Sequence, residues 1–184
     1  ALPTDDDLLR VIDRGMPGTA MPGWEKKFSR AERLELVQVV KSFSRFFETM
    51  QAPEPYGIGK PPRATAEALA EGRELYERIE CWKCHGRAGR GDGPSAPTLR
   101  DDADLPIRAA DLTENWNFNG GGTASDIFTR LRTGLDGTPM PTFSDLIDSK
   151  ILTETQLWHL ALYVRSLSPE RPPAVRDVIE ARRI

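Results

Sequence analysis

Both cysteines of this 184-residue chain lie in one pentapeptide of the pattern C-x-x-C-H, at residues 81–85. Cysteines three positions apart lie about one helical turn apart on the same face of a helix. Cys81 and Cys84 can therefore add their sulfur atoms to the two vinyl groups along one edge of a porphyrin, and His85 can reach the iron. The pattern is typical of covalent haem c attachment. No other feature constrains the fold as strongly, because a bound haem would become part of the core.

Three other interpretations of the motif conflict with its surroundings. A thioredoxin-like dithiol would follow a β-strand, whereas residues 64–80 form a helix-favouring stretch without β-branched runs. A Cys2His2 zinc site needs a second histidine at a workable spacing, and His159 lies 74 residues after His85. A disulfide across two residues would be strained and would give His85 no role.

Charge and hydropathy narrow the class of protein. The chain has 25 Lys and Arg against 28 Asp and Glu, a net charge of -3, which argues against a nucleic-acid-binding surface. No apolar run approaches the roughly 18 residues of a transmembrane span. The polar residues 1–7 predict that this chain carries no signal peptide. Fifteen glycines and 15 prolines predict long irregular stretches between short helices.

The chain contains a diverged internal repeat. Residues 4–24 align without a gap on residues 123–143, and both contain the loop pattern Gly-Thr-x-Met-Pro. After five extra residues in the second copy, residues 29–44 align on residues 153–168. Each copy is predicted to be a helix, a glycine-rich loop with Met-Pro, and a second helix, which helical periodicity alone does not explain.

The two copies differ in what precedes them. About 60 residues with the C-x-x-C-H motif precede the second copy, and three residues precede the first. Either the first copy has lost its attachment half, or it is a remnant that never binds haem. A half-domain of this size buries too little surface to stand alone. We therefore expect residues 1–44 to pack against the haem domain and to cover its apolar faces.

The sequence predicts four segments. Residues 1–50 form the partial repeat without an attachment motif, residues 51–63 a Pro/Gly linker, residues 64–168 the haem domain and residues 169–184 a C-terminal tail. Helices are expected over residues 5–14, 29–47, 64–80, 123–132 and 153–167.

Residues 64–168 resemble a class I cytochrome c. The likeness rests on a helix that leads into C-x-x-C-H, a methionine between two prolines, and an aromatic last helix. It implies an all-α class I cytochrome c fold, with short helices around one covalently bound haem, preceded here by the partial half-domain. Gly72 and Tyr76 resemble the small and aromatic pair that lets the first and last helices cross closely, with Trp158 or Tyr163 as partner.

The resemblance also implies a set of haem-binding residues. Its axial iron ligands would be His85 and Met140, although Met140 could instead be a core methionine that fills a gap. Pro97, followed by Leu99, would offer its carbonyl to the far ring nitrogen of His85 and so orient the ring. The cofactor is one haem c with its iron per chain. Two further candidates for contact with a haem propionate are Arg108 and Trp116.

The implied function is electron transfer without catalysis. Such a protein shuttles single electrons between respiratory redox partners while both axial ligands stay bound. The alternative is a catalytic or sensor haem, such as a peroxidase, with an exchangeable sixth ligand. A third reading is a structural interaction module in which the first copy serves as a docking surface. Met21 stands where an axial methionine would, so a second haem could be supplied by a segment outside this chain.

The resemblance extends to partner and compartment. Residues 89–94, 99–102 and 111–113 look more loosely like cytochrome modules that accompany molybdenum oxidoreductases, so the expected partner is such an enzyme or another cytochrome. Haem c is attached outside the cytoplasm, which predicts a periplasmic location. Residues 81–100 carry four basic side chains and one acidic side chain. We expect this surface to steer an acidic partner to the haem edge.

Overall fold

The computed structural model describes residues 2–52, 54 and 57–169. Within these residues the regular secondary structure is helical, and two isolated β-bridges join Gly15 to Pro22 and Arg100 to Pro106. The predicted all-α class is confirmed. The helices are α1 (Asp5–Arg14), α2 (Arg30–Ser42), α3 (Phe46–Thr49), α4 (Ala66–Arg78), α5 (Trp82–His85), α6 (Ala124–Thr133), α7 (Ser144–Asp148) and α8 (Glu154–Ser166), with short 3-10 helices η1 (Ala96–Thr98) and η2 (Asn115–Asn117).

Capping boxes fix the starts of the four helices that belong to the repeat. In each box, the side chain of the first residue accepts from the backbone three residues on, and the acidic or amide side chain there accepts in return. These starts agree with the sequence prediction to within one residue. The paired residues are Thr4 with Asp7, Ser29 with Glu32, Thr123 with Asp126, and Thr153 with Gln156.

Two helix assignments from the sequence are wrong. The single helix expected over residues 29–47 ends at Ser42, and a separate turn, α3, follows. The Ser42 hydroxyl donates to the Val39 carbonyl oxygen, and the Ser44 hydroxyl accepts from the Phe46 amide. Such local bonds compete with the helical pattern. The unpredicted α7 occupies the five extra residues of the second copy.

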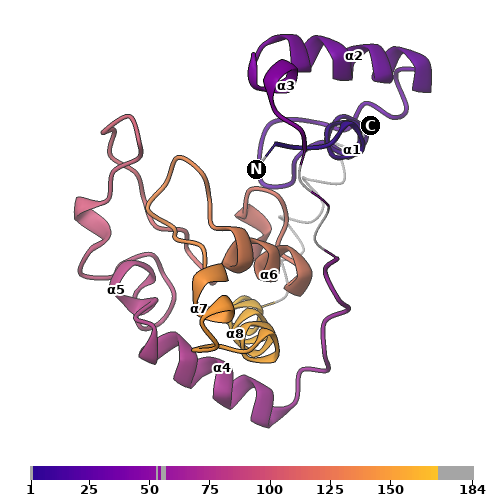
Figure 1. Cartoon of the computed structure of the whole chain (residues 1–184). Coiled ribbons are helices and arrows are strands. Elements are labelled where there is room, and N and C mark those ends of the chain that lie inside the picture. The colour runs from indigo at the N-terminus through magenta and orange to yellow at the C-terminus, as the bar shows by residue number, and fades with distance from the viewer. Residues whose placement is uncertain (1, 53, 55–56, 170–184) are drawn as a thin grey trace.

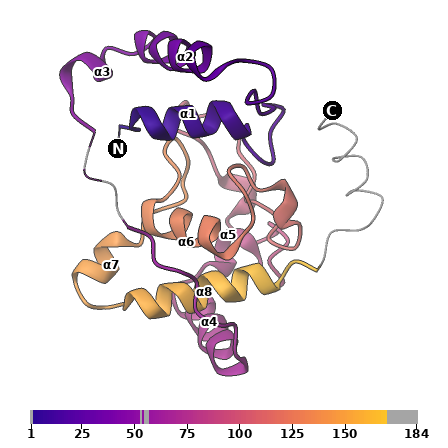
Figure 2. The same ribbon diagram turned by 90° about the vertical axis from the view of Figure 1, so that its right-hand side faces the viewer.

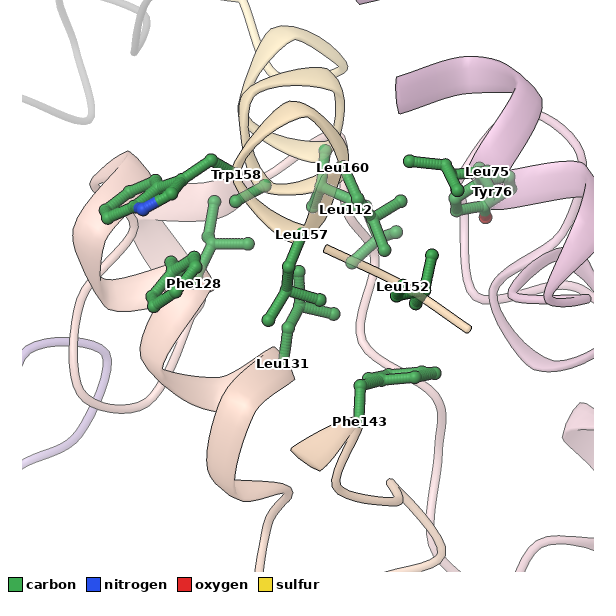
Figure 3. Close-up of a cluster of buried hydrophobic side chains, with 13 residues drawn as sticks. Leu75, Tyr76, Leu112, Phe128, Leu131, Phe143, Leu152, Leu157, Trp158 and Leu160 are labelled. Atoms are coloured by element: carbon green, nitrogen blue, oxygen red, sulfur yellow. The ribbon is translucent and has the colours of Figure 1, made fainter. Parts of the chain in front are cut away.

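The main core lies where α4 crosses α8. A Cβ on Gly72 would overlap the carbonyl oxygen of His159 and crowd the Cβ of Tyr163, so only glycine permits this approach. Tyr76 packs edge-on against Tyr163, with ring centroids 5.6 Å apart. Tyr163 is therefore the partner of both residues, whereas Trp158 stacks on Phe128. Figure 3 shows buried side chains of α4, α6 and α8 gathered around α8, together with Leu112, Phe143 and Leu152 from the segments between the helices.

The first copy forms a separate group of helices. Figure 1 shows α1, α2 and α3 together at one end of the molecule, and the chain after α3 running past the second copy to α4 at the other end. Figure 2 shows the same separation from the side. The first copy meets the loop before α6 where Pro17 accepts a hydrogen bond from the Gly120 amide (2.9 Å) and Gly18 approaches the Phe118 carbonyl.

The expected packing of residues 1–44 is thus only partly seen. The first copy touches the haem domain through its loop, while apolar side chains of α2 stay exposed. The four-segment division stays a prediction, and residues 170–184 of the predicted tail lie outside the described residues. No helix in the described part of the chain is long and apolar enough to cross a bilayer.

Candidate cofactor-binding site

A cavity of about 350 Å³ lies beside α5 and α6. Its wall contains six of the eight residues singled out from the sequence for haem binding. Four of them are the attachment and ligand residues Cys81, Cys84, His85 and Met140, and the other two are Leu99 and Arg108. These side chains are separated by up to 59 positions in the sequence, yet the fold brings them to one space. The rest of the wall is mainly apolar and includes Tyr76, Ile107, Leu112, Ile127, Leu131, Leu135 and Val164.

The attachment motif is wound into one helical turn. The Cys81 carbonyl accepts from the amides of Cys84 (3.3 Å) and His85 (3.0 Å). Gly86 ends this turn at φ 78°, where a Cβ would overlap the Asp92 carboxylate. The buried Tyr76 hydroxyl donates to the Gly86 carbonyl oxygen at 2.7 Å. Helix α4 thus holds the motif turn directly, so both cysteines and the histidine present a fixed surface to the cavity.

His85 is oriented by one backbone carbonyl. Its Nδ1 lies 3.0 Å from the Ala110 carbonyl oxygen, which can only accept, so Nδ1 carries the proton. Nε2 is then unprotonated and has a lone pair for a metal. Burial lowers the pKa of the imidazole, and the Ala110 hydrogen bond opposes this in part. The net lowering of the pKa favours the neutral ring near pH 7, which is the form that ligates iron.

The acceptor predicted for this bond, Pro97, is wrong in this structure. Pro97 is exposed in η1 and does not line the cavity, whereas Leu99 does. The described structure satisfies the same acceptor-x-Leu spacing at Ala110 and Leu112. Leu112 is buried, and its amide donates to the Gly89 carbonyl, which fixes this segment against the motif loop. Both Pro97 with Leu99 and Ala110 with Leu112 have this spacing. The sequence alone did not show that the second pair, whose leucine is buried, would provide the acceptor.

The loop that carries Met140 is rigid for identifiable reasons. Gly134 ends α6 at φ 72°, and the Leu135 amide donates to the Met140 carbonyl at 3.2 Å. The Met140 amide donates to the Thr138 hydroxyl, also at 3.2 Å. Prolines on both sides restrict the backbone further. The half-buried thioether therefore reaches the cavity wall from a defined position.

The two propionate candidates differ in placement. Arg108 is exposed and lines the cavity, so it belongs to the solvent-facing part of the wall. Trp116 is half-buried and is not part of the wall, although Asn117 and Phe118 beside it are. The structure thus brings Arg108 to the site and leaves Trp116 outside the wall.

Arg130 is a wall residue that sequence reasoning missed. Its guanidinium donates to the carbonyl oxygens of Asn119 (2.5 Å) and Gly121 (2.7 Å), which ties the loop before α6 to the cavity. Burial lowers the pKa of this group. The available signal was its position on α6, three residues after Ile127, which also lines the cavity.

The thiol environment agrees with attachment better than with the other interpretations. Both cysteines are unpaired, and burial raises the pKa of Cys81 to about 12. A reactive dithiol or a zinc thiolate needs the opposite shift. His159 does not line the cavity, because its Nδ1 lies 2.6 Å from a Glu71 carboxylate oxygen where α4 meets α8. Across residues 2–52, 54 and 57–169, no cluster of three His, Cys, Asp or Glu could hold a metal ion.

A haem c fits this set of residues. The cavity has the size range of cofactor pockets, which are mostly apolar with a few fixed polar groups. It offers two thiols for thioether bonds, one nitrogen ligand and one thioether sulfur. This donor set, on an apolar wall, is the one that haem iron uses in His/Met cytochromes.

Comparisons with known proteins agree with this description. The sequence model of the cytochrome c family matches residues 69–168. The chain is also similar to one in a structure of the reducing HAO-like protein complex from Kuenenia stuttgartiensis. The identity is 41% and the TM-score 0.80, over 92% of this chain and 74% of that one. No curated protein matches the chain significantly.

Proposed function

Because the chain belongs to the cytochrome c family, we propose that it binds one haem c through Cys81 and Cys84. His85 and Met140 would be the axial ligands. In this role the chain passes single electrons between redox proteins. The carrying observation is the single cavity on whose wall both thiols, the oriented imidazole and the thioether lie.

Each protein group has a separate task. The haem, when bound, supplies a one-electron Fe(III)/Fe(II) couple. Cys81 and Cys84 attach it by adding their S–H groups across its vinyl groups. Ala110 holds the His85 ring with Nε2 free, and the bonds around Met140 keep the soft thioether in place, which favours the reduced state. Once the haem is attached, electron transfer requires no side chain to donate a proton or act as a nucleophile.

The apolar wall controls access of solvent. Leu112, Ile127, Leu131 and Val164 are buried side chains of the wall, and they exclude water from the inner part of the site. Arg108 marks the exposed side of the same cavity. A haem edge at that side would let a partner approach, since electron transfer needs proximity and no substrate binding.

The structural neighbour supports a role as a subunit of a redox complex. That protein belongs to a complex described as reducing and HAO-like, and the similarity covers 92% of this chain, which is more than the haem domain alone. We infer that this chain also delivers or accepts electrons within a larger respiratory assembly. A molybdenum oxidoreductase or another cytochrome is the expected partner class. Since haem c is attached outside the cytoplasm, we propose that the assembly lies in the periplasm or an equivalent compartment.

The test is the denatured intact mass of the chain, matured with the haem c attachment machinery, together with its reduced spectrum. A gain of one haem, mapped to the peptide with residues 81–85, supports the proposal. An unchanged mass, with a bound metal or a disulfide instead, would overturn it.

Carbon monoxide separates electron transfer from the catalytic or sensor alternative. Reduced wild-type protein with Met140 bound should take up little carbon monoxide at neutral pH, while Met140→Ala should bind it readily. If wild type takes up as much carbon monoxide as a readily binding Met140→Ala protein, the sixth position is already exchangeable. That result would favour a peroxidase-like or sensor role.

A further inference from the structure

The methionine loop of the first copy has the same backbone as the loop that carries Met140. Gly15 and Gly134 have φ of 71° and 72° and ψ of -171° and -169°. The amide of Met21 donates to the Thr19 hydroxyl at 3.2 Å, as Met140 does to Thr138. Three further backbone bonds recur with lengths within 0.1 Å, from residues 15, 16 and 19 in one copy and residues 134, 135 and 138 in the other.

The helices of the two copies also pack through corresponding faces. The buried apolar cluster of the first copy consists of Leu9, Ile12 and Val37. These positions correspond to Phe128, Leu131 and Ala161, all of which belong to the core of the haem domain. The first copy is thus built as a methionine-bearing half of a haem domain, in local structure and in packing.

The cavity-facing positions of the second copy keep their apolar character in the first. Apart from two prolines, five apolar residues of the second copy line the cavity, and each has an apolar counterpart. The pairs are Ile127 with Leu8, Leu131 with Ile12, Leu135 with Met16, Met140 with Met21, and Val164 with Val40. A remnant without a ligand would have no reason to retain this set, because Met16, Met21 and Val40 are 37–38% exposed in the structure.

Helix α2 exposes the face that α8 uses to bind α4 and to close the cavity. Leu160 is 1% exposed and Val164 6%, while their counterparts Leu36 and Val40 are 36% and 37% exposed. Phe43, which corresponds to the packed Leu167, is 79% exposed. An exposed apolar face of this kind marks a contact surface.

We propose that Met21 is an axial ligand of a second haem c, held by a C-x-x-C-H-bearing helix from the polypeptide that precedes residue 1. That helix would pack on the exposed face of α2 as α4 packs on α8. The order along the chain supports this occupant, since residues 64–122 precede the second copy in the same way. The HAO-like neighbour is longer than this chain, which covers 74% of it. The inference rests on the proposed role of Met140.

The test uses the polypeptide expressed from its natural start and matured with the haem c attachment machinery. We expect a denatured mass with two haems, one of them on the peptide with residues 81–85. In the reduced protein, Met21→Leu should raise carbon monoxide uptake from near zero to about one per chain. Met140→Leu should do the same at the other haem, and the double variant should bind two.

Met50→Leu is the control, since Met50 is also an exposed methionine (55% exposed) but lies at the end of α3, outside the methionine loop and outside the set of cavity-facing positions. It should leave carbon monoxide uptake unchanged. A mass with one haem, or a Met21→Leu protein that binds no more carbon monoxide than wild type, would overturn this inference. Failure of the Met140→Leu protein to respond would instead contradict the proposed function, so the two failures are distinguishable.

Discussion

The two copies of the helix, loop and helix share their local backbone but differ in what covers them. The second copy contributes to a core of 13 buried apolar side chains, whereas the first buries only Leu9, Ile12 and Val37. Where the second copy has the fully buried Leu157, the first has Arg33, whose guanidinium lies 2.7 Å from the Asp13 carboxylate. Caps and glycines therefore determine the local structure, and burial depends on whether an attachment half is present.

Removal of the attachment cysteines should cause the largest loss of stability, and this loss should be confined to the haem domain with the second copy. The variant Cys81→Ala with Cys84→Ala leaves the cavity of about 350 Å³ without a covalent occupant. At roughly 24 cal/mol per Å³, this corresponds to on the order of 8 kcal/mol, a large part of the stability of a typical domain. Hydrogen exchange should show loss of protection in α4 and α8, with α1 and α2 little changed.

The control is the single variant Cys84→Ala, which can keep one thioether bond and should lose less protection. If the double variant keeps the exchange protection of wild type, the haem does not supply the core. The difference between the copies would then need another cause.

The close crossing of α4 and α8 provides the next test of how the two copies differ. In Gly72→Val, new side-chain atoms must fit where a Cβ already overlaps the His159 carbonyl. Overpacking of this kind costs about 3 kcal/mol, seen as a lower midpoint in denaturant. Gly57→Val is the matched control, because nothing lies within 4 Å of its Cβ position. Equal midpoints for the two variants would contradict the crossing as described.

The sequence predicted those parts of the molecule that depend on short-range patterns. The four capped helix starts, the repeat and the attachment motif follow from residues a few positions apart. Met140, 55 positions after His85, was expected beside this motif only because of the resemblance to a cytochrome c. The sequence did not predict that Ala110 would replace Pro97 as the partner of His85. Both positions precede a leucine by two residues, and the choice depends on which leucine is buried.

Other errors have the same origin in tertiary context. The early end of α2 at Ser42 depends on hydrogen bonds between the hydroxyls of Ser42 and Ser44 and nearby backbone groups. The role of Arg130 depends on a loop eleven residues earlier that folds back onto α6. The basic excess in residues 81–100 is reduced by acids outside that window, because Lys83 pairs with Glu80 and Arg87 with Glu77. The steering of an acidic partner stays a prediction, with fewer free charges to carry it.

The ion pair inside the first copy gives a smaller test. Arg33→Leu installs the residue type of the second copy but leaves Asp13 without this partner, in a site where the two side chains are 10% and 24% exposed. We expect a loss of about 2 kcal/mol, less than for a fully buried pair. Hydrogen exchange in α1 and α2 should increase, while the haem spectrum stays the same.

Restoration of charge balance provides the control for that variant. Adding Asp13→Asn to Arg33→Leu removes the unpaired carboxylate and should recover part of the protection. If the double variant is as unstable as the single variant, packing of the arginine stem matters more than its charge.

The smallest expected effect concerns the polar edge of the α4 and α8 crossing. Glu71 accepts hydrogen bonds from Gln156 (3.0 Å) and His159 (2.6 Å), and these bonds lower the pKa of its carboxyl below the usual value. A lowered native pKa adds stability above the unfolded-state pKa, and that stability is lost as the pH falls through the native value. Since Glu71 is 38% exposed, Glu71→Gln should cost only about 0.5 kcal/mol at pH 7. The difference from wild type, measured by denaturant titration at several pH values, should vanish in acid.

Glu35→Gln, at the position of α2 that corresponds to His159, is the matched control and should show a smaller change. If the stability difference between Glu71→Gln and wild type persists in acid, it arises from packing and not from the charge of Glu71. The α4/α8 pair and the α1/α2 pair would then differ in shape alone.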